Sequence, residues 1–317
     1  MSRTPSAIAY LVTAHAEPLQ LRRLVQSLAA PWASFFVHID RKTSIEPFAK
    51  ALVGVAPVTF VRRRVRVYWG GWSQVEATLR LMQCAMTKDR TLARFALISG
   101  ACYPLKSNET LRDYLLCDAR EHISAFPMPD DSRDKPLTRL TRWHLQRGLR
   151  GTGLGARAAR LVNDALRVLP PRRLAGLVPY AGSSWFVLTR DAVATILERV
   201  ETDRRFVSFF RYSHCPDESF FQTLLASSAL REHIAGSLTF ADWSPCIEQP
   251  CLIREDHLPR LLDGSQELFF ARKFSSRNAH LLDRIDAARG TARFAPMRDA
   301  EADAALAPVY AGRLAAS

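Results

Sequence analysis

The sequence lacks the long apolar segments that carry proteins into or across membranes. No run of about 18 consecutive apolar residues occurs in its 317 residues. Met1-Ser2-Arg3 leads almost directly into a strand-like segment, and no cleavable signal pattern intervenes. These absences predict a soluble, cytoplasmic protein.

Motifs that bind metals or nucleotide phosphates are also missing. The six cysteines form no Cys-x-x-Cys pair and show no metal-ligand spacing with the eight scattered histidines. Asp-x-Asp is absent, no Gly-x-Gly-x-x-Gly follows the first apolar segment, and no Walker-type lysine is present. We expect no metal and no other cofactor, and cysteines that are reduced and mostly packed. A bridge between the close pair Cys246 and Cys251 is a lesser alternative.

Acidic residues are too few to balance the basic ones. The formal net charge is +13, which favours an anionic partner such as nucleic acid, a nucleotide diphosphate or an acidic membrane surface. The excess gathers from Leu137 to Arg173, where nine arginines, the first of them Arg139, stand against the single acid Asp164. Apolar residues interleave with these arginines at helical spacing. A helix lying on anionic lipid and a solvated basic face explain the stretch equally well.

The first half of the chain alternates between apolar strands and amphipathic helices. Strands are predicted over residues 7–13, 34–39, 58–61 and 94–99, and helices over 19–28, 46–53, 73–87 and 108–116. This alternation predicts an α/β fold, with a mostly parallel sheet flanked by helices on both faces. Ligands bind beyond the carboxyl ends of such strands, so we expect a site at His15, Asp40 and residues 68–73 and 99–107.

The second half is less regular. Strands are predicted over residues 121–126, 185–188 and 237–243. Helices are predicted over 191–200, from Pro216 onward, and over 258–262 and 278–288. The Ala-rich residues 291–317 are weakly periodic, and we expect a loosely ordered tail there.

Two adjacent carboxylates, Asp217 and Glu218, stand where a loop is predicted to become a helix. Pro216 suits the first helical position, and the apolar residues that follow continue at helical spacing. A carboxylate in a first turn faces the positive end of the helix dipole, which fixes its position. From position alone, an ordinary pair of dipole partners explains these acids better than catalysis does.

A basic pair near the C-terminus is the best candidate for binding a diphosphate without a metal. Arg272 and Lys273 stand between Phe269-Phe270 and Phe274. The aromatic side chains can fix the backbone while both cations point into a cleft. An ordinary solvated pair is the alternative.

Seven short blocks follow one another in a fixed order. They are Tyr10 to His15, Val37-His38-Ile39-Asp40, Trp69-Gly70-Gly71-Trp72-Ser73, Leu97-Ile98-Ser99-Gly100 with Tyr103-Pro104-Leu105-Lys106, Gly182-Ser183-Ser184-Trp185-Phe186, Pro216-Asp217-Glu218, and Phe270-Ala271-Arg272-Lys273-Phe274. In this order they resemble the core-2/I-branching β-1,6-N-acetylglucosaminyltransferases and the peptide O-xylosyltransferases, which share glycosyltransferase family 14. The resemblance leaves out mainly the basic stretch and the tail.

The resemblance implies a GT-A-like, Rossmann-like fold and a nucleotide-sugar donor bound without a metal. It implies that Asp40 contacts the nucleoside, that Arg272 and Lys273 bind the diphosphate, and that Glu218 is the catalytic base. One in-line displacement needs a base on the acceptor side and positive charge on the leaving side, which agrees with these roles. Asp217 is then a cap or a support. The candidate substrate contacts are Trp69, Ser184, Trp185, Asp217 and Trp243.

The chain also departs from the family pattern. Cys102 stands where the branching enzymes have an acid, and the equivalent of an upstream basic residue cannot be placed. The blocks around Glu218 and Arg272 look more like the xylosyltransferase versions. A secretory anchor and the dense cysteine pairing of the animal enzymes are missing. These departures suggest a bacterial-type relative that works in the cytosol on a glycolipid or polysaccharide precursor.

We therefore expect an inverting, metal-independent transferase that forms a β linkage from a UDP-sugar, with UDP-GlcNAc as first choice and UDP-xylose second. The acceptor is a glycan, glycolipid or peptide.

We expect one large domain over residues 1–290, with a nucleotide-sugar half (1–126), a basic helical insertion (127–180) and an acceptor half (181–290). The stretch from Arg139 to Arg173 is a candidate for peripheral contact with an anionic membrane, and no nucleic acid is expected. The alternative is a non-catalytic basic α/β protein that binds nucleic acid or membrane.

Overall fold

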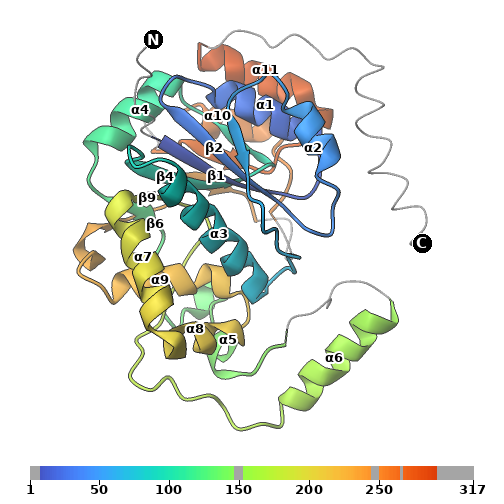
Figure 1. The fold of residues 1–317 in the computed structure, drawn as a ribbon, viewed down its shortest axis with the longest axis vertical. Helices are drawn as coiled ribbons and strands as arrows, with labels where there is room; N and C mark the ends of the chain where they lie inside the picture. The colour runs from blue at the N-terminus through green and yellow to red at the C-terminus, as the bar shows by residue number, and fades with distance from the viewer. Residues whose placement is uncertain (1–7, 146–152, 244–249, 265–266, 291–317) are drawn as a thin grey trace.

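A mostly parallel central sheet forms in the computed structural model, which describes residues 8–145, 153–243, 250–264 and 267–290 (Figure 1). Its strand order is β10-β6-β9-β4-β1-β2-β3. β1 (Ile8–Ala14) runs parallel to β2 (Ala33–Ile39) and β4 (Arg94–Ser99), and β3 (Val58–Phe60) extends the sheet beside β2. β9 (Phe186–Thr189) runs antiparallel to both β4 and β6 (Glu121–Ile123), and β10 (Ile234–Ala235) pairs with β6.

Helices cover both faces of this sheet, as the apolar strand patterns predict. Alternate residues of β1 point to opposite faces: Tyr10 and Val12 enter one buried cluster, and Ala9 and Leu11 enter the other. The first cluster packs under α1 (Pro18–Leu28), α2 (Glu46–Ala51), α4 (Asn108–Cys117), α10 (Leu258–Leu261) and α11 (Ala279–Ala288). The second packs under α3 (Trp72–Lys88), α7 (Arg190–Thr202), α8 (Arg204–Arg211) and α9 (Phe220–Ala226). The predicted α/β class is confirmed.

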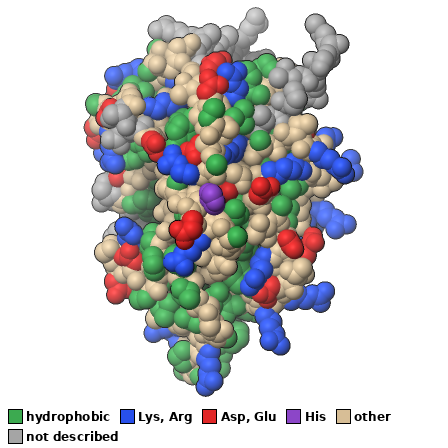
Figure 2. Space-filling view, turned by 90° about the vertical axis from the view of Figure 1, so that its left-hand side faces the viewer, with side chains coloured by type: hydrophobic (Ala, Val, Ile, Leu, Met, Phe, Trp, Pro, Cys, Tyr) green, Lys and Arg blue, Asp and Glu red, His purple; other side chains and the backbone are tan. Residues whose placement is uncertain are grey.

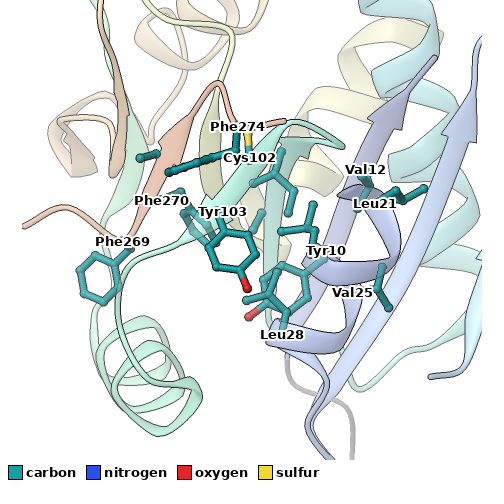
Figure 3. Packing of buried hydrophobic residues seen from close by; sticks show 14 of the residues in the cluster. Tyr10, Val12, Leu21, Val25, Leu28, Cys102, Tyr103, Phe269, Phe270 and Phe274 are labelled. Carbon is teal, nitrogen blue, oxygen red and sulfur yellow. The ribbon is translucent and has the colours of Figure 1, made fainter. Parts of the chain in front are cut away.

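A second, small sheet joins segments that are far apart in sequence. Its order is β11-β12-β5, with β11 (Thr239–Ala241) parallel and β5 (Cys102–Pro104) antiparallel to β12 (Phe270–Arg272). Figure 3 shows how its aromatic side chains pack toward β1 and α1. The ring of Phe270 meets the edge of Tyr10 at 6.5 Å between centroids, and Tyr103 meets Phe274 at 5.8 Å. The small sheet is therefore anchored in the main core.

The predicted segments of the first half are confirmed to within about two residues, the uncertainty usual at element ends. In the second half, the strand predicted over residues 121–126 divides into β6 and β7 (Phe126–Pro127), and β7 pairs with β8 (Tyr180–Ala181). The helix predicted from Pro216 is wrong in its start, because a 3₁₀ turn (Pro216–Glu218) precedes α9. β5, β12 and α8 were not predicted. The tail over residues 291–317 lies outside the described residues.

The basic stretch contains two helices, α5 (Thr138–Thr141) and α6 (Leu154–Leu166). α6 lies apart from the layered body in Figure 1. Across the described ranges, none of the helices has both the length and the apolar character needed to cross a bilayer.

The described cysteines differ in oxidation state. Cys84, Cys102, Cys117 and Cys215 carry free thiols, as predicted. Cys251 is disulfide-bonded, so the expectation of a reduced thiol is wrong at that position. Cys246 lies outside the described residues.

Candidate active site

The predicted site segments meet at one edge of the main sheet. Ala14 lies opposite Ile39, and Thr13 lies opposite Ser99, so the residues that follow β1, β2 and β4 emerge side by side. β9 is antiparallel to β4, and it is therefore the start of β9, preceded by Ser184 and Trp185, that reaches this edge. The sequence blocks at His15, Asp40, Gly100 and Ser184 are thereby brought together.

The small sheet adds Arg272 and Lys273 to the same edge. Arg272 lies opposite Cys102, three residues after β4 ends, and the backbone N–H of Phe274 donates to the Ala101 carbonyl at 2.8 Å. Phe270 and Phe274 are buried on either side of the basic pair, as the prediction required.

The loop after β1 holds the chain that follows this pair. The carboxylate of Glu17 accepts hydrogen bonds from the Ser275 hydroxyl at 3.0 Å and from the Ser276 backbone N–H at 2.8 Å. The segment that carries Lys273 is therefore fixed against the β1–α1 loop.

His15 lies among several charged side chains on this side of the site. Desolvation by the surrounding protein lowers the pKa of His15. The carboxylate of Asp40 acts to raise that pKa, whereas Lys273, Lys42 and Arg272 lower it. The predicted nucleoside residue and the predicted diphosphate residues therefore lie around one side chain.

Asp40 is already engaged by its own loop. Its Oδ1 accepts the backbone N–H groups of Lys42 at 2.9 Å and of Val67 at 3.2 Å, and its Oδ2 lies 3.3 Å from the Lys42 ammonium. The carboxylate is nearly buried and orders the loop after β2.

Arg272 stacks on an aromatic ring and has an unsatisfied donor. Its guanidinium carbon lies 4.1 Å from the centre of the Trp185 ring, and its buried Nε has no hydrogen-bond partner among the described residues. Burial lowers the pKa of Arg272, and the carboxylate of Asp217 opposes that shift. A planar cation fixed by stacking, with a free N–H, is suited to an anionic oxygen of a ligand.

Asp217 is the buried member of the carboxylate pair. Its Oδ2 accepts hydrogen bonds from the Ser184 hydroxyl at 2.7 Å and from the Gln74 amide at 2.9 Å. Its Oδ1 is buried and has no partner in the part of the chain that the structure describes. Burial, and then the neighbouring charge of Glu218, raises the pKa of Asp217 to about 7. Two separate segments therefore hold Asp217 in place, and its role as a cap or a support stays a prediction.

Glu218 is held by two cations. Its Oε2 accepts from the guanidinium of Arg139 at 2.8 Å and from the ammonium of Lys135. All three side chains are less than one-fifth exposed. Its Oε1 accepts no hydrogen bond from the residues that the structure describes, so one carboxylate oxygen is available to a ligand.

Close backbone contacts fix the turn that carries both carboxylates. The N–H of Cys215 (φ 47°) donates to the Gly70 carbonyl, and the N–H of Gly182 donates to the Glu218 carbonyl, each at 2.9 Å. A Cβ atom at Gly182 would lie 1.6 Å from the Ser124 carbonyl oxygen, so only glycine fits there. The two sequence blocks that contain Gly70 and Gly182 therefore lie against the turn that carries Asp217 and Glu218.

The remaining predicted substrate contacts lie around this centre. Trp69 is 49% exposed and meets the ring edge of His214 at 6.0 Å. Trp243 is also 49% exposed. It lies two residues after Ala241, which is opposite Arg272 in the β11–β12 pairing. Half-exposed indole rings can stack on a sugar or a base.

A thiol nucleophile at Cys215 is not supported. Its Sγ lies 3.6 Å from His214 Nε2, but burial, followed by the charges of Asp217 and Glu218, raises the pKa of the thiol. The thiolate that a nucleophile needs is therefore disfavoured.

Three residues of the site were not identified from the sequence. Gln74 supports Asp217, and Lys135 and Arg139 pair with Glu218. Arg139 was counted with the basic stretch that is a candidate for membrane contact, and the structure corrects that grouping. Within the described ranges, no three His, Cys, Asp or Glu side chains gather as metal ligands.

The raised pKa of Asp217 predicts a pH-dependent loss of stability. The folded protein keeps this proton up to about pH 7, whereas the unfolded chain loses it near 3.8. Stability should fall as pH rises through this window, and Asp217→Asn should not show that loss. The difference in unfolding free energy between the variant and the parent should grow by up to about 1.4 kcal/mol per pH unit.

Urea unfolding at a series of pH values measures this difference. Asp131→Asn, at an exposed position, is the control and should follow the parent protein. A difference between Asp217→Asn and the parent that stays constant with pH would contradict the raised pKa.

Comparison with known proteins gives consistent matches. Residues 8–262 match the family model described as Core-2/I-Branching enzyme. Human xylosyltransferase 2 is 27% identical over 310 residues, which covers 90% of this chain and 34% of that protein. Human beta-1,3-galactosyl-O-glycosyl-glycoprotein beta-1,6-N-acetylglucosaminyltransferase 3 is 24% identical over 229 residues, which covers 68% of this chain and 47% of that protein. The chain thus spans a third to a half of the length of these relatives.

Among solved structures, mouse xyloside xylosyltransferase 1 is similar at a TM-score of 0.37 and 11% identity. The match covers 84% of this chain and 97% of that chain. Similarity at this level carries no argument about function.

Proposed function

Because this chain belongs to the Core-2/I-branching enzyme family, we propose that it is a glycosyltransferase that moves a sugar from a UDP-sugar to an acceptor hydroxyl with inversion. The observation that carries the proposal is the meeting of a carboxylate pair and a basic pair at one sheet edge. Asp217 lies close enough to Arg272 to influence its pKa, and both contact the segment Ser184-Trp185. A GT-A-like fold is part of this proposal.

The proposed reaction is a single displacement. A carboxylate oxygen of Glu218 takes the proton of the acceptor hydroxyl as the hydroxyl oxygen bonds to the anomeric carbon. The bond from that carbon to the UDP oxygen breaks, and UDP leaves with the bonding electrons. An α-linked donor then gives a β-linked product. Lys135 and Arg139 position the carboxylate, and its unpaired Oε1 is the oxygen available to the hydroxyl.

The leaving diphosphate is assigned to Arg272 and Lys273 instead of a metal. Arg272 offers a planar fork held by Trp185, and Lys273 adds a second cation at the next residue. We assign Asp40, which lies in the ordered loop after β2, to contact with the nucleoside of the donor. We assign Trp69, Trp185 and Trp243 to the walls of the sugar and acceptor sites, and Ser184 with Asp217 to polar contacts there.

We keep the donors expected from the sequence, UDP-GlcNAc first and UDP-xylose second; relatives of both kinds match the chain. The proposed acceptor is a glycan, glycolipid or peptide. We place the reaction in the cytoplasm, as the sequence predicts.

Binding of UDP in the presence of a chelator tests this proposal. UDP at about 100 times its dissociation constant should stabilise the fold by about 2.7 kcal/mol, which a thermal shift measures. A screen of UDP-sugars for donor hydrolysis would then identify the sugar. A shift that needs a divalent metal would overturn the metal-independent mechanism. No shift with or without metal would overturn the transferase assignment and favour the non-catalytic alternative.

A further inference from the structure

Exposed apolar side chains concentrate in one stretch of the protein. Of the thirteen large apolar side chains that are exposed within the described ranges, eight lie between residues 143 and 178. Leu154, Leu161 and Val168 are the most exposed of these, at 84%, 70% and 86%. Exposed apolar side chains that gather in this way are typical of an interaction site.

The orientation of α6 explains this exposure. Leu154 and Leu161 are seven residues apart and share one face of the helix, and Val168 follows just past its end. The opposite side of α6 faces the protein, where the Asn163 side chain bonds to both the N–H and the carbonyl of Leu145, at 2.8 and 2.7 Å. Ala156 is buried on that side. The apolar face therefore points away from the protein.

Positive charge borders the apolar face. Arg157, Arg160 and Arg173 are exposed, and the one acid of the helix, Asp164, lies 3.4 Å from Arg167. Trp143 is 37% exposed and lies over the buried Arg172, with 5.0 Å between the guanidinium and the ring centre. On the face of the molecule in Figure 2, by contrast, acidic and basic side chains are intermixed.

We propose that α6, with Val168 just past its end, is a docking surface for an anionic lipid bilayer. The helix would lie in the plane of the interface with its leucines in the acyl boundary and its arginines among the headgroups. A nucleic-acid duplex presents mainly phosphates and polar base edges, which do not cover Leu154 and Leu161. A second copy of the chain would bring the same arginines together. The surface acts separately from the proposed sugar transfer.

The protein should bind vesicles of phosphatidylcholine mixed with phosphatidylglycerol about tenfold or more tightly than vesicles of phosphatidylcholine alone. Flotation or sedimentation measures this ratio, which should fall as salt rises. The double change Leu154→Asp with Leu161→Asp should lower binding to the mixed vesicles at least tenfold. The double change Arg157→Glu with Arg160→Glu should remove the preference for the anionic lipid.

Val53→Asp is the matched control, because Val53 is 72% exposed but lies outside this stretch. It should leave vesicle binding unchanged. All variants should keep the parent's melting temperature and its response to UDP, which separates loss of the surface from loss of the fold or of the donor site. Unchanged vesicle binding by the Leu154 and Leu161 variant would overturn the proposal. So would a concentration-dependent dimer, or binding to single-stranded DNA, that this variant abolishes.

Discussion

Replacing Glu218 by Gln is expected to lower the rate of sugar transfer by about 10²–10⁴-fold, the usual contribution of a general base. The amide keeps the shape of the side chain but cannot take the proton of the acceptor hydroxyl. UDP binding should persist, because the proposed diphosphate contacts come from Arg272 and Lys273. Transfer assays and UDP-induced thermal shifts on the same preparation measure both quantities.

Loss of the charge at Glu218 also leaves Lys135 and Arg139 without their shared acidic partner. The variant should therefore be less stable than the parent, since the largely buried Lys135 loses its acidic partner and Arg139 keeps only the exposed Asp134. Glu218→Asp keeps the charge but withdraws the carboxylate by one methylene, and it should lower transfer while retaining more stability. Glu232→Gln, at an exposed position, is the control and should act like the parent. Near-normal turnover by Glu218→Gln would exclude Glu218 as the base.

Arg272→Ala should weaken UDP binding and lower the rate of transfer by about 10²–10³-fold, the usual cost of removing one group that stabilises charge in a transition state. The substitution removes the stacked guanidinium from Trp185 and leaves the buried Asp217 without its nearby cation. Calorimetric titration with UDP and donor-hydrolysis rates report the two effects.

Two further variants serve as comparisons for Arg272→Ala. Arg272→Lys keeps the charge but loses the planar stack and the Nε donor, and it should recover only part of the activity. Arg112→Ala removes another stacked arginine, 4.5 Å from the ring centre of Trp32, and should leave UDP binding unchanged. If Arg272→Ala bound UDP as tightly as the parent, the diphosphate site would have to lie elsewhere.

The fold of the first half could be predicted because its strands and helices carry strong local patterns. β1, β2 and β4 are buried on both faces and read as continuous apolar runs, so their ends were identified closely. The direction of β9 could not be predicted, because its residues give no sign that it pairs antiparallel to β4. The strand β12 was also missed, because it has three residues and gains its partners only from β5 and β11.

The candidate site was predicted in its residue types but not in its connections. Asp217, Glu218, Arg272 and Lys273 were proposed from the sequence, and the structure brings Asp217 and Arg272 together beside Ser184 and Trp185. Nothing local to Lys135 or Arg139 points to Glu218, because such a pairing depends on how the chain folds back. Arg139 therefore looked like one more arginine of a basic stretch.

The hydrogen bonds around the carboxylate pair have a consequence for folding. Gln74 meets Asp217 across 143 residues of sequence, and Lys135 and Arg139 meet Glu218 across 83 and 79 residues. Contacts of such long range form only when large loops have closed. The β1–β2–β3 part of the central sheet can assemble from strands that are neighbours in sequence, but these carboxylate contacts need segments from both halves of the chain in place. Recovery of activity during refolding is therefore a readout of the completed tertiary structure, whereas recovery of helix and strand content is not.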